Sequence, residues 1–222
     1  MILYMYMDSH THDNEMVRRS HLHSVEIAVL QVVFFFVVPI ILLYFRIIPI
    51  SGRIYTLLFV SLLLYGVIKK QGWTSESVGL TTKNVKQFFG PYFFATVTAM
   101  VAIIEIARML GVSAVSSWWI NPHFLFMFFI VSFFQELVFR GILMPLLSRI
   151  FPDAFTVIVV NALLFAGMHV IYPNPVIGLP FAFIGGIFFA ALYRRYPNLY
   201  LVSISHAVLN FLAVWYGLFT IN

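Results

Sequence analysis

The sequence contains no cysteine among its 222 residues. This absence excludes a disulfide framework, a thiolate nucleophile and any metal site that needs cysteine ligands. Charged residues are also scarce, because Asp, Glu, Lys and Arg make up 9% of the chain, whereas soluble domains carry about 25%. The 13 Lys and Arg residues are too sparse for a surface that binds a phosphate backbone, so the sequence predicts no nucleic-acid partner.

Apolar residues are present in excess. They make up 62% of the chain, with 25 Phe, and the mean hydropathy is +0.97. A soluble monomer does not expose this much apolar surface, and a disordered chain has the opposite composition. We therefore predict an all-α, polytopic transmembrane helix bundle with membrane lipid as its first partner. At roughly 20 residues per span the length allows about six to eight spans.

Seven apolar ranges follow a polar N-terminal tail of residues 1–24. The longest linker between them, Lys69–Gly90, is polar and is expected to form an interfacial loop or a short surface helix. Pro145 and Pro180 fall inside two of the ranges, which predicts kinks there. The seven predicted spans are Val25–Tyr44, Ile54–Ile68, Tyr92–Leu110, Phe124–Leu147, Ala154–Ile171, Val176–Tyr193 and Leu199–Leu218.

The chain divides into the tail 1–24, a region 25–122 with the first spans and the polar loop, and a region 123–222 with most of the polar residues that lie within spans. Most Lys and Arg residues lie in the tail and in the loops after the second, fourth and sixth spans. The positive-inside rule therefore predicts a cytoplasmic N-terminus and, with seven spans, a C-terminus on the opposite side.

Polar side chains within spans are rare, costly and usually face the bundle interior, so they are the first candidates for function. Six of the eight in this chain form three short clusters in the region 123–222. The eight are Glu105, Gln135, Glu136, Arg140, Asn161, His169, His206 and Asn210.

The first cluster is Gln135, Glu136 and Arg140. Glu136 and Arg140 are four residues apart, so they share a helix face and can pair. One interpretation is a buried ion pair that only fixes helix packing. The other is functional, because a carboxylate in a low-dielectric site can have its pKa moved enough to act as a base.

The second and third clusters add two imidazoles and a carboxamide. Phe165 and His169 are four residues apart, and so are His206 and Asn210. Taken singly, the second cluster fits an interfacial histidine and the third an interhelical hydrogen bond, which contributes only about 0.6 kcal/mol in membranes. Together with Glu136 they can activate a water and stabilise an oxyanion, as hydrolysis of an amide bond requires.

These spacings resemble the three motifs of the CPBP intramembrane proteases (CAAX protease and bacteriocin-processing, or Abi), which include the Ras-converting CAAX endopeptidase. The similarity covers roughly residues 124–218. It implies an endopeptidase that cleaves a membrane-associated protein or peptide, in a prokaryotic cell membrane. The motifs stand here as Glu136-x-x-x-Arg140, Phe165-x-x-x-His169 and His206-x-x-x-Asn210.

The resemblance also implies a role for each residue. His169 acts on the attacking water, and Arg140 orients Glu136. His206 and Asn210 form the oxyanion site. The family's first motif usually begins with two glutamates, whereas this chain has Gln135 in the first position.

A glutamine orients water but takes up no proton at neutral pH. Three explanations remain for this departure: Glu136 serves as the base, the chain is an inactive relative, or Gln135 is an engineered trap. We favour the first, because Glu136 is the only carboxylate within the predicted spans of the region 123–222.

Two His and one carboxylate are also the ligand set of many catalytic zinc sites, so Glu136, His169 and His206 form an alternative metal site. We expect metal-free chemistry without a cofactor, because the chain has no His-Glu-x-x-His helix and Asn210 beside the second histidine suits an oxyanion. In the predicted spans, His169 lies nearer the outer face than Gln135 and His206. A tilt or a break in the fifth span must therefore bring them to one level.

Two other functional classes remain open. A non-catalytic bacteriocin-immunity or membrane scaffold protein is favoured by Gln135. A transporter or seven-helix receptor is disfavoured, because no lysine follows Lys86 to form a retinal Schiff base and the two halves show no internal repeat. The sequence does not choose a substrate or an oligomeric state.

Overall fold

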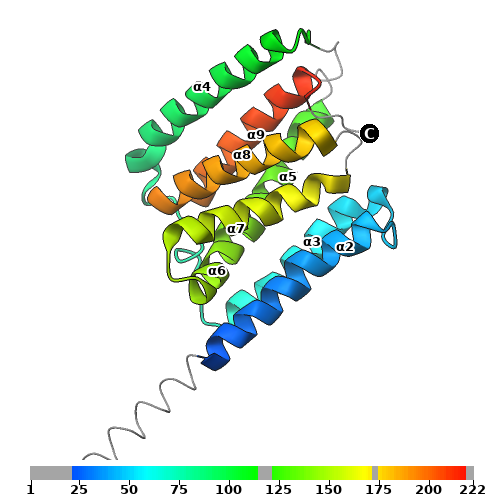
Figure 1. Cartoon of the computed structure of the whole chain (residues 1–222). Coiled ribbons are helices and arrows are strands. Elements are labelled where there is room, and N and C mark those ends of the chain that lie inside the picture. The colour runs from blue at the N-terminus through cyan, green and yellow to red at the C-terminus, as the bar shows by residue number, and fades with distance from the viewer. Residues whose placement is uncertain (1–21, 115–121, 172–174, 219–222) are drawn as a thin grey trace, which may run out of the picture.

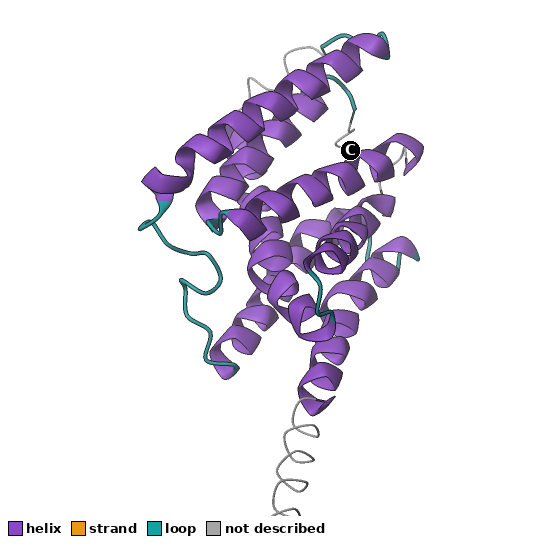
Figure 2. Ribbon diagram, turned by 60° about the vertical axis from the view of Figure 1, so that its left-hand side comes forward, coloured by secondary structure: helices purple, strands orange, loops and turns teal. Residues whose placement is uncertain are grey.

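The structure is a computed structural model that describes residues 22–114, 122–171 and 175–218. Every regular element in these ranges is a helix, and Figure 2 shows helices joined only by loops. The helices lie roughly side by side, from α4 at one edge through α9, α8 and α7 to α2 and α3 at the other (Figure 1). The predicted all-α bundle is confirmed.

Each of the seven predicted ranges overlaps one or more helical segments. The first runs over Leu22–Tyr44 and contains the π-helix η1 and helix α2. The bounds are η1 Val33–Val37, α2 Val38–Tyr44, η2 Ile50–Gly52, α3 Arg53–Lys70, α4 Val85–Met109, α5 Pro122–Glu136, η4 Leu137–Leu143, α6 Met144–Ile150, α7 Ala154–Gly167, η5 Met168–Ile171, α8 Pro175–Arg195 and α9 Leu199–Trp215.

Five helical segments are long and apolar enough to cross a membrane. α9 is apolar but has only 17 residues, and α3 ends on Lys69 and Lys70. Large apolar side chains cover the outside of the bundle: Phe94 is 71% exposed and Val176 82%. Such a surface fits lipid, and the chain is an integral membrane protein. The five segments are Leu22–Tyr44, Val85–Met109, Phe126–Ile150, Ala154–Ile171 and Pro175–Arg195.

Two π-helical segments interrupt the spans, and a proline follows each. Pro39 follows η1 and Pro145 follows η4, both within the first turn of the next α-helix. A proline ring clashes with the carbonyl four residues before it and leaves that carbonyl without its helical hydrogen bond. A wider turn relieves the clash. The π-helix η4 precedes Pro145, and Pro180 lies inside α8; the kinks that the sequence predicts at these prolines stay predictions.

Helix α4 begins at Val85, well before the predicted start at Tyr92. The pair Gly90-Pro91 favours a helix boundary, yet Pro91 lies within the helix. It lies in the second turn, and the carbonyl four residues before it belongs to the exposed Gln87. Water can satisfy the carbonyl that Pro91 leaves unpaired there, so the proline is tolerated.

The polar loop between α3 and α4 lies at the surface of the bundle and is anchored to it by a few buried contacts. It forms turns and no helix in residues 71–84, all of which the structure describes. Val78 is buried, and Gly79 has a positive φ of 76° that favours glycine. The Leu199 N–H donates to the Gly79 carbonyl at 2.8 Å and Asn198 Nδ2 to the Thr81 carbonyl at 2.9 Å. The loop therefore fixes the start of α9.

Helix α9 packs against both α4 and α5, and α7 packs against α8 (Figure 1). The α7–α8 crossing is close, because Gly186 lies directly against Ala162. Small residues of this kind allow membrane helices to approach closely. Helices α5 and α9, together with the segments η4 and η5, carry the polar side chains that form the candidate site.

Candidate active site

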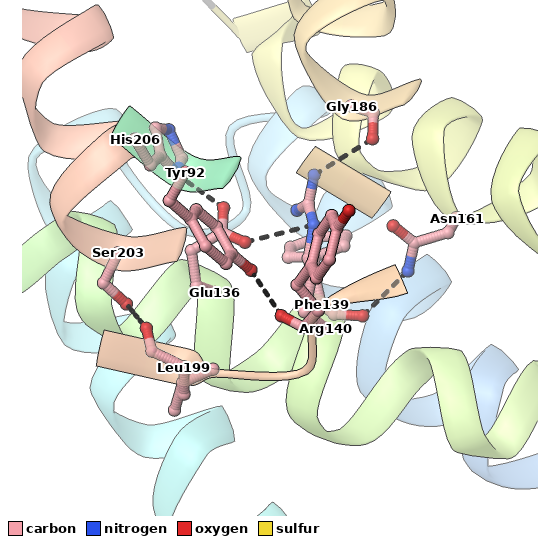
Figure 3. Close-up of polar contacts among 10 residues, drawn as sticks. Tyr92, Glu136, Phe139, Arg140, Asn161, Gly186, Leu199, Ser203 and His206 are labelled. Atoms are coloured by element: carbon pink, nitrogen blue, oxygen red, sulfur yellow. Dashed lines mark hydrogen bonds and ion pairs between the residues drawn. The ribbon is translucent and has the colours of Figure 1, made fainter. Parts of the chain in front are cut away.

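Glu136 is the centre of a buried polar network (Figure 3). It is the last residue of α5, and its side chain is fully buried. His206 Nδ1, from α9, donates to Glu136 Oε1 at 2.6 Å. Arg140 Nε lies 3.1 Å from Glu136 Oε2. That contact is an ion pair without hydrogen-bond alignment, so the carboxylate is held by one short hydrogen bond and one Coulombic contact.

Arg140 is a fully buried cation in η4. Its Nη2 donates to the Gly186 carbonyl of α8 at 3.2 Å. Its guanidinium carbon lies 4.6 Å from the ring centre of Phe165 and 5.6 Å from that of Phe189. Ion pair, hydrogen bond and aromatic faces together offset part of the cost of removing this charge from water. Arg140 thereby links Glu136 to the Gly186 carbonyl of α8 and to the two aromatic rings.

Phe165 connects the two histidines. Its ring centre lies 5.0 Å from that of His169 and 5.6 Å from that of His206. The imidazole of His206 also stacks on Phe189 at 4.7 Å. Both histidines therefore lie against the aromatic wall that encloses Arg140.

His169 lies in η5, where the fifth predicted span changes from an α-helix to a 3₁₀-helix after Gly167. The sequence predicts a tilt or a break in this span, and the structure has a break there. The Phe165 carbonyl can only accept, so His169 Nδ1 donates to it, at 2.9 Å. In the neutral imidazole the lone pair is then on Nε2. The same holds for His206, whose Nδ1 donates to Glu136.

Gln135 and Asn210 are less closely engaged. Gln135 is buried, and its Oε1 accepts no hydrogen bond from the residues that the structure describes. Asn210 lies one turn after His206 on α9 and is partly buried. No hydrogen bond of its carboxamide is present within the described ranges. The structure thus brings Glu136, Arg140 and His206 into direct contact, with His169 linked through Phe165.

Two in-span polar residues from the sequence lie outside this network. Glu105 is on α4, half-exposed, and pairs with Arg108 at 2.9 Å. Asn161 is fully buried in α7, and its Nδ2 donates to the Phe139 carbonyl at 2.8 Å. That bond satisfies a carbonyl of the π-helix η4, so Asn161 supports the segment that carries Arg140.

The sequence does not reveal the position of Tyr92. This α4 tyrosine is buried and donates from its hydroxyl to the Tyr196 carbonyl at 2.9 Å (Figure 3). A tyrosine at the end of a predicted span is typical of the aromatic belt at a membrane surface. No feature of the sequence distinguishes it from one.

Chemically, the network offers a buried carboxylate and two imidazoles with Nε2 lone pairs. Within the described ranges, no group of three His, Asp or Glu side chains is arranged to hold a metal ion. The arrangement can accept a proton at an imidazole and hold the resulting positive charge beside Glu136.

Residues 117–212 match a protein-family model described as type II CAAX prenyl endopeptidase Rce1-like. The matched segment contains all six candidate site residues and excludes α4. Comparison with curated proteins and with solved structures gave no match.

Proposed function

From the match of residues 117–212 to the Rce1-like family model of type II CAAX prenyl endopeptidases, we propose that the chain is an intramembrane endopeptidase of the CPBP (CAAX protease) family. Its substrate is a peptide bond of a membrane-associated protein or peptide, and its nucleophile is a water activated by the glutamate and the histidines. The observation that carries the proposal is the 2.6 Å hydrogen bond from His206 to Glu136, which joins two family motifs across α5 and α9.

Because Glu136 is fully buried, we propose that it orients and supports His206 instead of acting on the water itself. Its side chain is fully buried and already accepts a hydrogen bond from His206 Nδ1. The atom of this pair with an open lone pair is His206 Nε2, which takes a proton from the attacking water. Glu136 then stabilises the imidazolium, and Arg140 keeps the carboxylate in place. Nε2–H returns the proton to the leaving amine when the peptide bond breaks.

The remaining residues bind the water and the oxyanion. Gln135 Oε1 is buried and accepts no hydrogen bond from the described part of the chain, so it is suited to accept one from the nucleophilic water. His169 Nε2 is a second acceptor for that water. The carboxamide of Asn210 donates to the oxyanion that develops on the carbonyl oxygen, an interaction whose loss costs about 100- to 1,000-fold in kcat in other hydrolases.

The test is cleavage of a fluorogenic peptide library by purified protein in lipid, with and without a strong chelator. We expect wild-type protein to cleave and Glu136→Gln to be inactive. Glu105→Gln, which alters an exposed carboxylate on α4, is the matched control and should remain active. If cleavage is lost on chelation, the Glu136, His169 and His206 set holds zinc instead.

The variant His206→Gln distinguishes two roles for His206, the general base and the oxyanion donor. Glutamine keeps a hydrogen-bond donor but accepts no proton, so the base assignment predicts an inactive variant. Substantial remaining activity returns His206 to the oxyanion site and Glu136 to the role of base.

The alternative is a non-catalytic immunity or membrane scaffold protein, and Gln135 is the feature that favours it. If wild-type protein cleaves nothing, Gln135→Glu restores the family's usual pair of glutamates. Activity in that variant shows that the site is otherwise competent. If the variant is also inactive, the scaffold function is the correct one.

A further inference from the structure

Helix α4 contacts α9 through a pair of hydroxyl groups. Thr96 Oγ1 lies 2.7 Å from Ser205 Oγ and 2.7 Å from the carbonyl oxygen of Tyr92, one turn earlier on α4. Ser205 is 4% exposed and immediately precedes His206. Because α4 lies outside the segment that matches the family model, this contact is a feature of this chain and not of the matched motifs.

The direction of the two hydrogen bonds follows from the number of protons. A threonine hydroxyl has one proton, and a carbonyl oxygen can only accept. Both contacts are satisfied if Thr96 donates to the Tyr92 carbonyl and Ser205 donates to Thr96 Oγ1. Thr96 thus connects Ser205 of α9 to the Tyr92 carbonyl of α4 through two hydrogen bonds.

Tyr92 extends the same contact toward the end of α8. Its hydroxyl donates to the Tyr196 carbonyl, in the turn between α8 and α9. Tyr92 and Thr96 are four residues apart, so they share the α4 face that packs on α9. One bond holds the turn three residues before the start of α9, and the other holds α9 itself one residue before His206. The two contacts together restrain the rotation of α9 against α4.

Ser205 and His206 are consecutive residues of α9, so their side chains point in directions about 100° apart around the helix axis. A rotation of α9 about that axis therefore moves both side chains together. Backbone atoms lie about 2.3 Å from a helix axis and the tip of an imidazole roughly 6 Å, so a rotation of about 10° moves that tip by about 1 Å. A displacement of 1 Å can reduce a rate about 100-fold. The 2.6 Å hydrogen bond between His206 and Glu136 leaves little room for such movement.

We propose that Thr96 is a positioning residue: its hydroxyl, bonded to Ser205, sets the rotation of α9 at which His206 Nδ1 meets Glu136. The effect on catalysis rests on the proposed function, whereas the effect on the His206 hydrogen bond does not. Thr96 acts through Ser205 and α9 and need not touch the substrate.

The test compares Thr96→Val, which replaces the hydroxyl with a methyl group, with two matched controls. Thr98→Val removes a hydroxyl on the same helix that donates only to the Phe94 carbonyl, at 2.9 Å. Ser203→Ala removes a buried hydroxyl on α9 that donates to the Leu199 carbonyl, at 2.7 Å. The set is completed by Ser205→Ala, the double variant and Thr96→Ser, which restores the hydroxyl.

The first readout is the proton resonance of His206 Nδ1–H in protein reconstituted in lipid nanodiscs, assigned by its loss in His206→Gln. A short hydrogen bond to a carboxylate gives a strongly downfield signal. We expect Thr96→Val and Ser205→Ala to shift or broaden this signal. Thr98→Val, Ser203→Ala and Thr96→Ser should leave it as in wild type.

The second readout is peptide cleavage. We expect Thr96→Val to lower kcat about tenfold or more with KM unchanged, and the double variant to be no worse than either single variant. A His206 signal in Thr96→Val that equals the signal in Thr98→Val overturns the proposal. If wild-type protein cleaves no peptide, the proposed function fails, and the resonance comparison alone confirms or overturns the positioning role.

Discussion

The crossing of α7 and α8 at Gly186 should fail when a single methyl group is added there. A Cβ on Gly186 would lie 2.9 Å from Ala162 Cα and 3.0 Å from Ala162 Cβ. Carbon atoms pack best at about 3.5–4.0 Å, so the overlap is more than half an ångström. The opposing atoms belong to the backbone or lie next to it, so no rotamer change relieves the overlap. The two helices must separate.

The neighbouring glycine provides a matched control. A Cβ on Gly185 would meet only Phe189 Cε2, at 4.0 Å. Both Gly→Ala changes gain the same helix propensity, up to about 1 kcal/mol. The difference in stability between the two variants therefore isolates the cost of overpacking, typically about 1–3 kcal/mol. Gly186→Ala should be the less stable variant by that amount.

The measurement is unfolding of the purified protein in mixed micelles as the fraction of denaturing detergent rises. Activity provides a second readout, because the Gly186 carbonyl accepts a hydrogen bond from Arg140 and moves with α8. Gly186→Ala should therefore lose more activity than Gly185→Ala. Equal or greater stability of Gly186→Ala refutes the argument that this crossing depends on a missing side chain.

Three further predictions concern α7. The Thr156 N–H donates to the Asp153 carboxylate at 2.7 Å and holds the pKa of that carboxyl below its ordinary value. The wild-type helix cap should therefore weaken as pH falls below about 4. Unfolding curves at neutral and acidic pH should show this loss of stability in wild type but not in Asp153→Asn. Asn161→Ala leaves the buried Phe139 carbonyl unpaired and should cost about 1–2 kcal/mol of unfolding free energy; an unchanged midpoint contradicts this. Phe165→Leu removes a ring that contacts Arg140 and should cost about 1–2 kcal/mol of stability, while kcat falls less than tenfold; complete inactivation would give Phe165 a direct role in catalysis.

Contacts within one helix can be predicted from the sequence of this chain. Glu136 and Arg140 pair as their spacing of four residues predicts, because a helix places such residues on one face whatever surrounds it. The depth of His169 predicts either a tilt or a break in the fifth span, and the structure has the break after Gly167. Composition alone predicts the membrane bundle.

Contacts between helices are not predictable in the same way. The hydrogen bond from His206 to Glu136 joins residues 70 positions apart, and it depends on the rotation of two helices that no local pattern specifies. Thr96 and Ser205 illustrate the same limit. A hydroxyl in a span is unremarkable in a sequence, because it can bond to a carbonyl of its own helix.

The start of α4 differs from the prediction, because a proline disturbs a helix less where the freed carbonyl is exposed to solvent. Pro91 favours the start of a span after it, yet α4 continues through it, because the unpaired carbonyl lies at a hydrated end of the helix. Pro145 does perturb its span, and there the chain adopts the π-helix η4. Both prolines remove one helical hydrogen bond, and whether water can reach the freed carbonyl determines whether the α-helix continues unchanged.

The energetics of the buried charges favour an enzyme over a scaffold. Glu136, Arg140 and His206 are each at most 2% exposed, and removing such groups from water costs more than their attraction commonly returns. Apolar residues of similar volume hold helices together at least as well, so a scaffold gains nothing from this set. A hydrolase does gain, because the same low-dielectric surroundings strengthen the interaction between Glu136 and an imidazolium formed during proton transfer. The aromatic rings of Phe165 and Phe189 contact both Arg140 and His206, and they give the pair the apolar surroundings that the proposed proton transfer requires.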